Sequence, residues 1–370
     1  MFCALAIAEE LRSCFPATDI LLVDADGDAT RAVARRAGLP VESLAVSGIA
    51  RGPGILKVAR NLALPLKVFL SLGQARAILD RFQPDVVVGV GGYASGPMVV
   101  VAARAGIPTL IHEANVRPGV TNALLAREVS LVSLGFAQAG AAFPVGRTLF
   151  TGNPIRSDVS TALVPGVARS AFGLAPQRKT VLVTGGSLGA RRLNAWVLRY
   201  WSRLVARGVQ VLWQCGPAHL SACIARLTRA DGVRLVPFVD DMAAAYAAAD
   251  LVVTSAGALV LAELAALGKP AILVPDRDAS EDHQRENALE LQRQGVAVCH
   301  VGHTAGDTGD TLFDLVASVI DDPDRRRALG VRIARLGQPD AGARIVAQVA
   351  RLAGLAAAGP IVTPDRRAIP

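Results

Sequence analysis

Short runs of β-branched and aliphatic residues alternate with longer stretches whose apolar positions recur every three or four residues. The short runs predict buried strands, and the longer stretches predict amphipathic helices. In the first half, the pattern predicts strands near 19–23, 43–46, 85–90, 109–111, 131–134 and 148–151, with helices at 5–11, 29–37, 56–82, 98–105 and 120–126. In the second half, it predicts strands at 180–184, 210–214, 234–237, 251–253 and 271–274, with helices at 190–207, 221–228, 242–248, 258–267, 284–294 and 341–355. Strands that alternate with helices in this way favour a doubly wound parallel sheet in each half.

A break in both spacings separates the two halves. It reads Gly152-Asn-Pro-Ile-Arg156, and both glycine and the Asn-Pro pair interrupt regular structure. We therefore expect two α/β/α domains facing each other across a cleft, over residues 1–156 and 157–338. The helix at about 341–355 is expected to pack back on the first domain. The tail at 356–370, rich in Pro, Ala and Arg, is expected to be disordered.

Two glycine-rich turns, one in each half, have the form of anion sites. They read Val86-Val-Val-Gly-Val-Gly-Gly-Tyr-Ala-Ser-Gly-Pro97 and Thr180-Val-Leu-Val-Thr-Gly-Gly-Ser-Leu-Gly-Ala-Arg-Arg-Leu-Asn194. Each leads from an apolar strand into a helix, which directs backbone N–H groups and the positive end of the helix dipole at an anion, usually a phosphate. One such turn is a weak signal. Two of them in successive halves indicate a site where two phosphorylated molecules meet.

Polar residues also follow other predicted strands, at the edge where open parallel sheets bind ligands. The loop at 112–122 offers Glu113 and Asn115 as base or acceptor-positioning groups, with an ordinary capped turn as the alternative. In the small-residue segment at 254–263, Glu263 lies in an otherwise apolar helix, where an unpaired carboxylate is costly. The two hydroxyls of a ribose could donate to it. Exposure to solvent, or pairing with Lys269 or an arginine, is the alternative.

A third polar loop lies at 275–287. It places Gln284 and Asn287 on one helical face, three residues apart. A charged, solvated start of a helix would have the same composition, so the loop is a weaker candidate for a ligand site.

Charge narrows the class of partner. The chain of 370 residues carries a formal net charge of +8, which indicates an anionic partner: a phosphorylated substrate, a membrane surface or nucleic acid. Nucleic acid is the weakest of these, because aromatic residues make up only 4% of the chain and do not interleave with basic ones. Residues 48–79 combine apolar side chains with Arg51, Lys57, Arg60 and Lys67, as a contact with an anionic membrane surface requires. Core packing is the alternative for those apolar residues.

Several other classes are not supported. No apolar run reaches the roughly 18 residues that span a bilayer, and the N-terminus lacks the basic region and cleavage site of a signal peptide. The five cysteines are dispersed without metal-ligand spacing, which favours reduced thiols and no metal site built by the protein.

Six segments occur in an order typical of one enzyme family. They are Gly91-Gly-Tyr-Ala-Ser-Gly-Pro97, His112-Glu-Ala-Asn115, Thr151-Gly-Asn-Pro-Ile-Arg156, Gly185-Gly-Ser-Leu-Gly-Ala190, Ser255-Ala-Gly-Ala258 with Glu263, and Asp282-His-Gln-Arg-Glu-Asn-Ala288. From Phe2 to about Leu355, the chain closely resembles the MurG family of bacterial glycosyltransferases, whose fold is the GT-B type with two Rossmann-like domains.

The resemblance implies a complete activity. The enzyme would transfer N-acetylglucosamine from UDP-GlcNAc to the muramyl 4-hydroxyl of lipid I (undecaprenyl-pyrophosphoryl-MurNAc-pentapeptide), with inversion and without a cofactor or metal. The product would be lipid II, the precursor of the peptidoglycan on which cell shape and cell division depend. The first domain would take the acceptor and associate with the membrane, and the second would bind UDP-GlcNAc. The protein would be peripheral, at the cytoplasmic face of the bacterial inner membrane, with no nucleic-acid partner.

The same resemblance assigns roles to individual residues. The positions matching the UDP-GlcNAc site are Asn115, Arg156, Ser187, Val239, Ala258, Leu259, Glu263 and Gln284. Among them, Ser187 and Arg156 would meet the UDP phosphates, and the Val239 backbone would meet uracil. Glu263 would take the ribose hydroxyls, and Gln284 would contact the donor sugar. The catalytic and acceptor positions are Glu113, Tyr93 and Asn194, with Gly91, Gly92, Ser95 and Gly96 around the lipid pyrophosphate.

The chain departs from the family pattern at its start. Family members begin with a strand and a Gly-Gly-x-Gly-Gly-His loop, whereas this sequence begins within the following helix, so we expect the first strand of the N-terminal sheet to be missing. Either the start codon lies further upstream or the product is defective. Residues 24–29 also replace a Gly-Thr turn that is usual in the family.

Other functions remain as alternatives. One is another GT-B enzyme, such as a diacylglycerol glycosyltransferase or a UDP-GlcNAc 2-epimerase, and another is a truncated UDP-sugar binder without catalysis. A nicotinamide oxidoreductase is disfavoured, because no acidic residue is suitably placed after a complete G-x-G-x-x-G turn.

Overall fold

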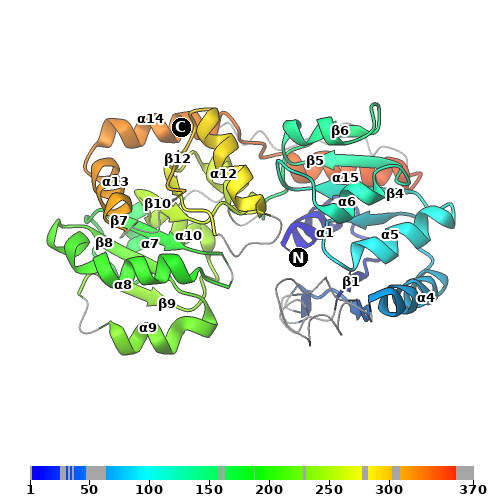
Figure 1. Cartoon of the computed structure of the whole chain (residues 1–370), viewed down its shortest axis with the longest axis horizontal. Helices are drawn as coiled ribbons and strands as arrows, with labels where there is room; N and C mark the ends of the chain where they lie inside the picture. The colour runs from blue at the N-terminus through cyan, green and yellow to red at the C-terminus, as the bar shows by residue number, and fades with distance from the viewer. Residues whose placement is uncertain are drawn as a thin grey trace. The chain divides into compact units, whose positions relative to one another are not determined.

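The computed structural model describes residues 2–25, 31, 34–35, 37–46, 64–156, 159, 163–186, 188–227, 231–276, 282–301 and 309–355 (Figure 1). These residues form two compact units. Unit 1 is Met1–Ile155 with Pro339–Pro370, and unit 2 is Arg156–Gln338. The change of unit after Ile155 falls within the Gly152–Arg156 break in the sequence pattern. The expected tail at 356–370 lies outside the described residues.

Unit 2 contains one six-stranded sheet and the helices that cover it. The strands are β7 (Thr180–Thr184), β8 (Gln210–Gln214), β9 (Val233–Val236), β10 (Leu251–Thr254), β11 (Ala271–Leu273) and β12 (Val298–Cys299). The helices are α7 (Pro165–Ala171), α8 (Arg191–Ala206), α9 (Leu220–Arg226), α10 (Met242–Ala248), α11 (Ala258–Leu267), α12 (His283–Arg293), α13 (Asp310–Ile320) and α14 (Pro323–Ala334), with a short 3-10 helix η3 (Pro217–His219).

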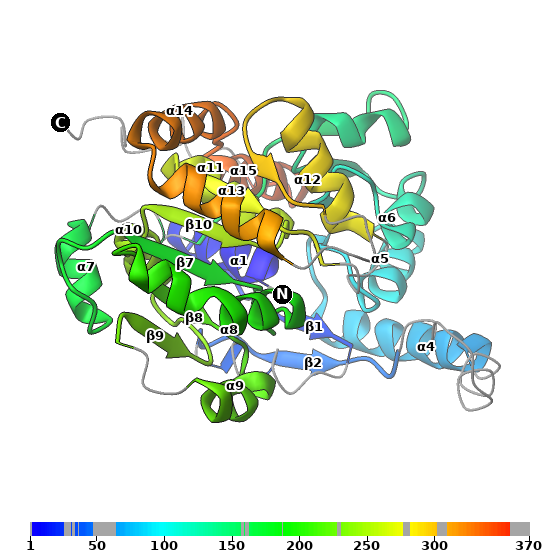
Figure 2. The ribbon, with the colours of Figure 1, turned by 60° about the vertical axis from the view of Figure 1, so that its left-hand side comes forward.

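The strand order in unit 2 is β12-β11-β10-β7-β8-β9, with every pair parallel. All residues of β7, β8 and β10 are buried, as expected for strands covered by helices on both faces. Helices α8 and α13 cover one face of the sheet (Figure 2). The rings of Tyr200 on α8 and Phe313 on α13 stack with their centroids 5.5 Å apart. The doubly wound parallel sheet predicted for this half is confirmed.

Unit 1 contains two parallel sheets. One pairs β1 (Leu22–Asp24) with β2 (Val41–Ser43), and the other has the order β3 (Val87–Gly89), β4 (Thr109–Glu113), β5 (Leu131–Leu134), β6 (Thr148–Phe150). The helices are α1 (Phe2–Cys14), α4 (Leu64–Phe82), α5 (Ser95–Arg104), α6 (Val120–Leu125) and α15 (Ala341–Leu352), with a 3-10 helix η1 (Ala137–Ala142). A shared core of α4 and α5 side chains contacts residues of both sheets, including Val23 and Val87.

The first and last helices that the structure describes, α1 and α15, pack together within unit 1. Helix α15 runs beside α1 (Figure 1), and a side chain at Gly342 would meet Glu10 of α1 at 3.5 Å. The α15 face that carries Ile345, Val346 and Val349 is buried. This contact explains why a helix so distant in sequence belongs to the first unit.

Several expected boundaries were wrong. Helix α1 is longer than 5–11, the strand expected at 43–46 lies at Val41–Ser43, and helices α7, α13 and α14 were not expected. Of the helix expected at 56–82, the described part begins at Leu64, and the helix expected at 29–37 is only partly described. Within the described ranges, no helix has both the length and the apolarity that crossing a membrane requires.

Candidate functional site

The order in which strands are added to the sheet of unit 2 reverses between the parallel neighbours β7 and β10. These strands pair in register, with Val183 opposite Val253 and Thr184 opposite Thr254. From β7 the chain continues through α8 to β8 on one side, whereas from β10 it continues through α11 to β11 on the other. Open α/β sheets bind ligands at such a point, beyond the carboxyl ends of the strands. Both small-residue turns expected to contact the donor lie here.

The glycine turn after β7 interlocks with the turn after β8. Gly189 has φ +75°, and a Cβ there would lie 1.9 Å from the Cys215 carbonyl oxygen. Gly216 has φ +88°, and its Cβ would lie 2.1 Å from the Leu188 carbonyl oxygen. Two backbones this close together admit only glycine, so the turn that opens α8 is fixed by a neighbouring strand. Ser187, at the centre of the predicted phosphate turn, lies outside the described residues.

Side chains from the ends of β7 and β8 hold this turn in place by hydrogen bonds. Thr184 Oγ1 donates to Gln214 Oε1 at 2.9 Å, and Gln214 Nε2 donates to the Gly186 carbonyl at 3.0 Å. Sequence reasoning missed both residues. A polar residue at the end of each fully buried strand was the available signal.

Asn194 is a second brace. Its Nδ2 donates to the Cys215 carbonyl at 2.8 Å, and its Oδ1 accepts from Trp213 Nε1 at 2.9 Å. The side chain is 5% exposed, with each end of the amide bonded inside unit 2. These contacts favour a role in positioning the turn over the predicted catalytic role.

The second turn, after β10, leads into α11, whose first residues are Ala258 and Leu259. Asn287 of α12, fully buried, donates to the Ala256 carbonyl at 3.2 Å and so fixes this turn. Gln284 Oε1 accepts from the Asp276 backbone N–H at 2.9 Å. The polar face of α12 is therefore attached to the loops that follow β10 and β11. Val239 is buried shortly before α10.

Glu263 lies inside α11, where the sequence predicted a carboxylate in need of partners. Its Oε2 accepts from the Tyr246 hydroxyl at 2.7 Å, and its Oε1 lies 3.9 Å from Arg156 Nε. Burial, followed by the neighbouring Glu263 charge and hydrogen bond, raises the pKa of Tyr246 well above its usual value. The phenol therefore stays protonated as a donor. Arg156, predicted near the phosphates, lies beside Glu263 in this structure, and Tyr246 was missed.

In unit 1, the turn after β3 has the backbone of an anion site. Gly91 and Gly92 have φ values of +87° and +82°, which residues with a Cβ atom rarely adopt. Ser95, at the start of α5, donates through Oγ to the Gly91 carbonyl at 2.7 Å. Tyr93 is 53% exposed at the tip of the turn, and Gly96 faces Thr121 of α6.

Glu113 ends β4 and is saturated by its own loop. Oε1 accepts from the backbone N–H and Nδ2 of Asn115, at 2.9 and 3.2 Å. Oε2 accepts from the backbone N–H of Gly119 at 3.0 Å and from Asn122 Nδ2 at 2.8 Å. Gly119 is the N-cap of α6, so this carboxylate, 2% exposed, fixes the whole 113–122 loop. Of the two roles left open by the sequence, this favours acceptor positioning over a base.

His112, next to Glu113, is fully buried and points into the sheet. Nδ1 lies 2.9 Å from Ser133 Oγ, and Nε2 lies 2.9 Å from Asn153 Oδ1. Asn153 Nδ2 donates to the Ala114 carbonyl at 3.0 Å, so Oδ1 is the acceptor that faces the ring and Nε2 carries the proton. Burial lowers the pKa of His112. The neutral ring joins β4 and β5 to the segment before unit 2.

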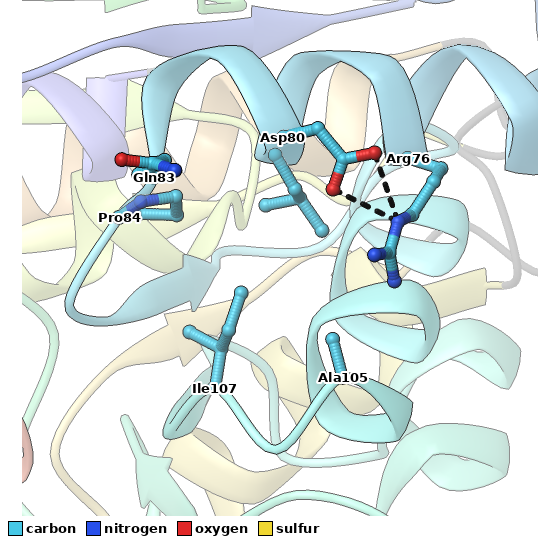
Figure 3. A pocket seen from close by; sticks show the side chains of 7 residues that line it. Arg76, Asp80, Gln83, Pro84, Ala105 and Ile107 are labelled. Carbon is cyan, nitrogen blue, oxygen red and sulfur yellow. Dashed lines mark hydrogen bonds and ion pairs between the residues drawn. The ribbon is translucent and has the colours of Figure 1, made fainter.

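A surface hollow of about 440 Å³ lies elsewhere in unit 1 (Figure 3). It is lined by Arg76, Leu79, Asp80, Gln83, Pro84, Ala105 and Ile107, with an ion pair between Arg76 and Asp80 at 2.9 Å. These residues precede β3 and β4, so the hollow is at the amino ends of the strands, opposite the edge that carries the Gly91 turn and Glu113. It is separate from the candidate site.

The predicted residues thus form two groups, one in each unit. Unit 1 holds Gly91, Gly92, Tyr93, Ser95, Gly96, Glu113 and Asn115, and unit 2 holds Arg156, Asn194, Val239, Ala258, Leu259, Glu263 and Gln284. In both units the group lies beyond the carboxyl ends of parallel strands. Among the described residues, no cluster of three or more His, Cys, Asp or Glu has a geometry able to hold a metal ion.

Comparison with known proteins gives first the class and then the family. Residues 1–132 match the glycosyltransferase family 28 N-terminal domain, and residues 180–328 match the glycosyltransferase family 28 C-terminal domain. With two parallel α/β units and a glycine turn in each, the chain is a glycosyltransferase of the GT-B fold class.

A relative from Cytophaga hutchinsonii is named UDP-N-acetylglucosamine--N-acetylmuramyl-(pentapeptide) pyrophosphoryl-undecaprenol N-acetylglucosamine transferase. It is 37% identical over 347 residues, which cover 94% of this chain and 92% of the relative. The crystal structure of MurG from Acinetobacter baumannii has a TM-score of 0.70 and 26% identity, with 95% of each chain covered. The chain belongs to the MurG family.

A UDP-GlcNAc 2-epimerase from Neisseria meningitidis, solved with UDP-GlcNAc bound, has a TM-score of 0.62 at 14% identity, over 95% of this chain and 96% of the epimerase. This likeness shows a common fold alone. The comparisons therefore favour the transferase over the epimerase that the sequence left open.

Proposed function

We propose that this chain transfers N-acetylglucosamine from UDP-GlcNAc to the muramyl 4-hydroxyl of undecaprenyl-pyrophosphoryl-MurNAc-pentapeptide, with inversion at the anomeric carbon. The observation that carries the proposal is the pair of turns at the β7/β10 reversal in a chain of the MurG family. In such a transfer, the acceptor hydroxyl attacks the anomeric carbon, its proton passes to a base, and UDP leaves with the bonding electron pair.

Unit 2 would hold the donor. The glycine turn after β7 leads into α8, a helix of 16 residues, so its backbone N–H groups and dipole favour the negative charge that develops on departing UDP. Ser187 belongs to this turn in sequence. Glu263 accepts hydrogen bonds from the ribose, and Arg156 beside it adds positive charge to the same region.

The remaining donor contacts would come from neighbouring elements of unit 2 and from one residue of unit 1. The backbone of Val239 meets uracil, and Ala258 and Leu259 at the start of α11 contact the nucleotide. Gln284 contacts the donor sugar. From unit 1, Asn115 contributes to the same donor, and its amide is positioned by Glu113.

Unit 1 would hold the acceptor. Gly91, Gly92, Ser95 and Gly96 surround the lipid pyrophosphate at the start of α5, a helix of 10 residues. Tyr93 is accessible at the tip of this turn and meets the acceptor sugar. Glu113 shapes the neighbouring loop, and Asn194 shapes the donor turn in unit 2, so both support catalysis by positioning.

A membrane contact would bring unit 1 to its lipid-linked substrate at the cytoplasmic face of the inner membrane. The first described turns of α4 expose Val68, Phe69 and Leu70 at 42, 73 and 52%, next to Lys67. An apolar patch beside basic residues suits an anionic lipid surface. Residues 48–63, the first part of the region expected at 48–79, lie outside the described residues.

The transfer is tested with purified protein, UDP-[14C]GlcNAc and lipid I. The expected result is label in the lipid fraction with one UDP released per sugar transferred. Consumption of UDP-GlcNAc without labelled lipid, or its conversion to UDP-ManNAc, would contradict the proposal. Diacylglycerol in place of lipid I is the matched negative acceptor.

The membrane contact is tested by flotation with vesicles of phosphatidylglycerol and phosphatidylethanolamine. The double variant Phe69→Ser with Leu70→Ser should reduce vesicle binding by about 30-fold or more, since each substitution removes roughly 1–2 kcal/mol of apolar burial. Ile224→Ser is the matched control, because Ile224 is also exposed, at 58%, but lies in unit 2. Equal loss in both variants would disprove a specific patch.

A further inference from the structure

Tyr246 is a fully buried phenol that no step of the proposed transfer has used. It lies on α10, which is capped at its start by Asp241 accepting from the Ala244 N–H at 2.8 Å. Its neighbours in the helix, Ala243, Ala244 and Ala245, are also buried. The ring is therefore held in one place, and its hydroxyl is a donor at a fixed position.

The acceptor of this hydroxyl is Glu263 Oε2, at 2.7 Å, on the next helix along the chain. Helix α11 is otherwise apolar, with the sequence ALVLAELAAL, and Glu263 is 8% exposed. A carboxylate in such surroundings is costly unless its oxygens are hydrogen-bonded, and bonds to an ionised acceptor are the stronger ones. The contact thus fixes the rotation of a buried charged group.

We propose that Tyr246 is a positioning residue that orients the Glu263 carboxylate toward the adjacent 2′- and 3′-hydroxyls of the donor's ribose, and so sets the preference for ribonucleotide donors. This inference rests on the proposed contact between Glu263 and the ribose. Tyr246 holds Oε2 from α10, while Arg156 lies on the side of Oε1, so the plane of the carboxylate is defined from two elements. A carboxylate binds two adjacent hydroxyls selectively only if its orientation is fixed, because each hydrogen bond depends on angle as well as distance.

The chemical consequence is selectivity against deoxyribose. A site built to accept a hydroxyl rejects an analogue that lacks it, because the buried acceptor is then left without its partner. Without the phenol, the carboxylate can turn or take up water, so UDP loses affinity while 2′-deoxy-UDP, which already lacks one bond, loses little.

The test is calorimetric titration of UDP, 2′-deoxy-UDP and 3′-deoxy-UDP into the full chain and its Tyr246→Phe variant. We expect the variant to bind UDP about tenfold more weakly and each deoxy analogue less than twofold more weakly, so that the preference for UDP falls by about fivefold or more. An equal loss for all three ligands, or no loss, would overturn the inference.

The chain provides a matched control. Tyr200 is a second buried tyrosine of unit 2 whose hydroxyl donates to a carboxylate, Asp310 Oδ1 at 3.0 Å, on α13. Tyr200→Phe removes the same atom at a distant place and should leave all three affinities unchanged. A change there equal to that of Tyr246→Phe would show a general effect of core disturbance and overturn the inference.

The variant Glu263→Gln separates the positioning role of Tyr246 from the proposed contact between Glu263 and the ribose. If Glu263→Gln keeps the preference for UDP over its deoxy analogues, the ribose contact itself is wrong and the role of Tyr246 falls with it. If Glu263→Gln abolishes the preference while Tyr246→Phe preserves it, only the positioning role is wrong. Titrations at 15 °C, with folding checked by circular dichroism, keep the comparison among folded proteins.

Discussion

Two buried glutamates, Glu113 at the end of β4 in unit 1 and Glu263 within α11 in unit 2, are held in different ways. Glu113 accepts hydrogen bonds from three residues of its own loop, none more than nine positions away. Glu263 is held by Tyr246, 17 residues earlier on another helix, and faces Arg156 at the start of the unit. The first carboxylate fixes a loop, whereas the second is positioned by separate elements.

The difference extends to the surroundings of each residue. In unit 2, the donor turn depends on contacts between β7, β8 and α8, so its shape is a property of the packed unit. In unit 1, the Glu113 side chain accepts from Asn115, Gly119 and Asn122, so this part of the loop after β4 is held by residues close to it in the sequence. Loss of a donor-site contact should therefore affect ligand binding, and loss of Glu113 should affect folding first.

The largest effect is expected at Gly189. Gly189→Ala would place Cβ 1.9 Å from the Cys215 carbonyl at a φ of +75°, so the two turns must separate. We expect a loss of about 4 kcal/mol or more in unfolding free energy and no measurable UDP binding. Denaturant unfolding followed by tryptophan fluorescence measures this, because Trp196, Trp201 and Trp213 all lie in unit 2.

Gly186→Ala is the control for this prediction. Gly186 has a φ of +78° in the same turn, but a Cβ there meets nothing within 4 Å. Gly186→Ala should lower the free energy of unfolding only by the backbone strain, about 1–2 kcal/mol. Similar losses in the two variants would show that the interlock of turns contributes nothing.

These turns also show how far the sequence could predict the molecule. The strands and glycine turns were predictable, since short β-branched runs ending in glycine follow local rules. The saturation of Glu113 was also open to prediction, because its donors lie within the same loop. The partners of Gly189 and Glu263 were not, because Cys215 and Tyr246 come near them only when the unit packs.

The missed helices α13 and α14 had local signals that were not used. The first repeats apolar residues at helical spacing over Asp310–Ile320, and the second begins with Asp322 as cap and Pro323 in the first turn. Asp322 accepts from the Arg325 backbone N–H at 2.9 Å, as expected of a helix cap.

The next largest effect is expected at Glu113. Glu113→Ala leaves the buried donor of Asn122 and the half-buried donors of Asn115 and Gly119 without an acceptor, which should destabilise unit 1 by about 2–4 kcal/mol. Hydrogen exchange of peptides covering β4 and α6 should speed up accordingly. Unchanged exchange with lost activity would restore Glu113 as a base.

A smaller effect is expected at Asn194. Asn194→Ala removes the acceptor of the Trp213 indole and the donor to Cys215, and should cost about 1–3 kcal/mol in unit 2. Fluorescence-detected unfolding measures the loss, and UDP affinity should fall with it because the adjacent turn loosens. If kcat collapses while stability and UDP affinity remain native, Asn194 takes part in the chemistry directly.

The smallest effect comes from the pH dependence of unit 1. Burial lowers the pKa of His112 in the folded state, so the unfolded chain binds more protons once the pH falls below about 6.5. The contribution of neutral His112 to the free energy of unfolding is fully present above that pH. It is lost as the pH falls, by at most about 1.4 kcal/mol per pH unit. Hydrogen exchange of β4 and β5, corrected for intrinsic rates, should show the loss between about pH 7 and 5, and His112→Gln should reduce it. The same slope in the variant would assign the dependence to other groups.

The contrast between the two glutamates is tested most directly by titrating UDP into Glu263→Gln and Glu113→Gln under conditions where both are folded. The account predicts that Glu263→Gln weakens UDP binding by about tenfold or more with near-native stability, whereas Glu113→Gln lowers the stability of unit 1 and leaves UDP affinity within about twofold. Native UDP affinity in Glu263→Gln, together with weakened binding in Glu113→Gln, would contradict it.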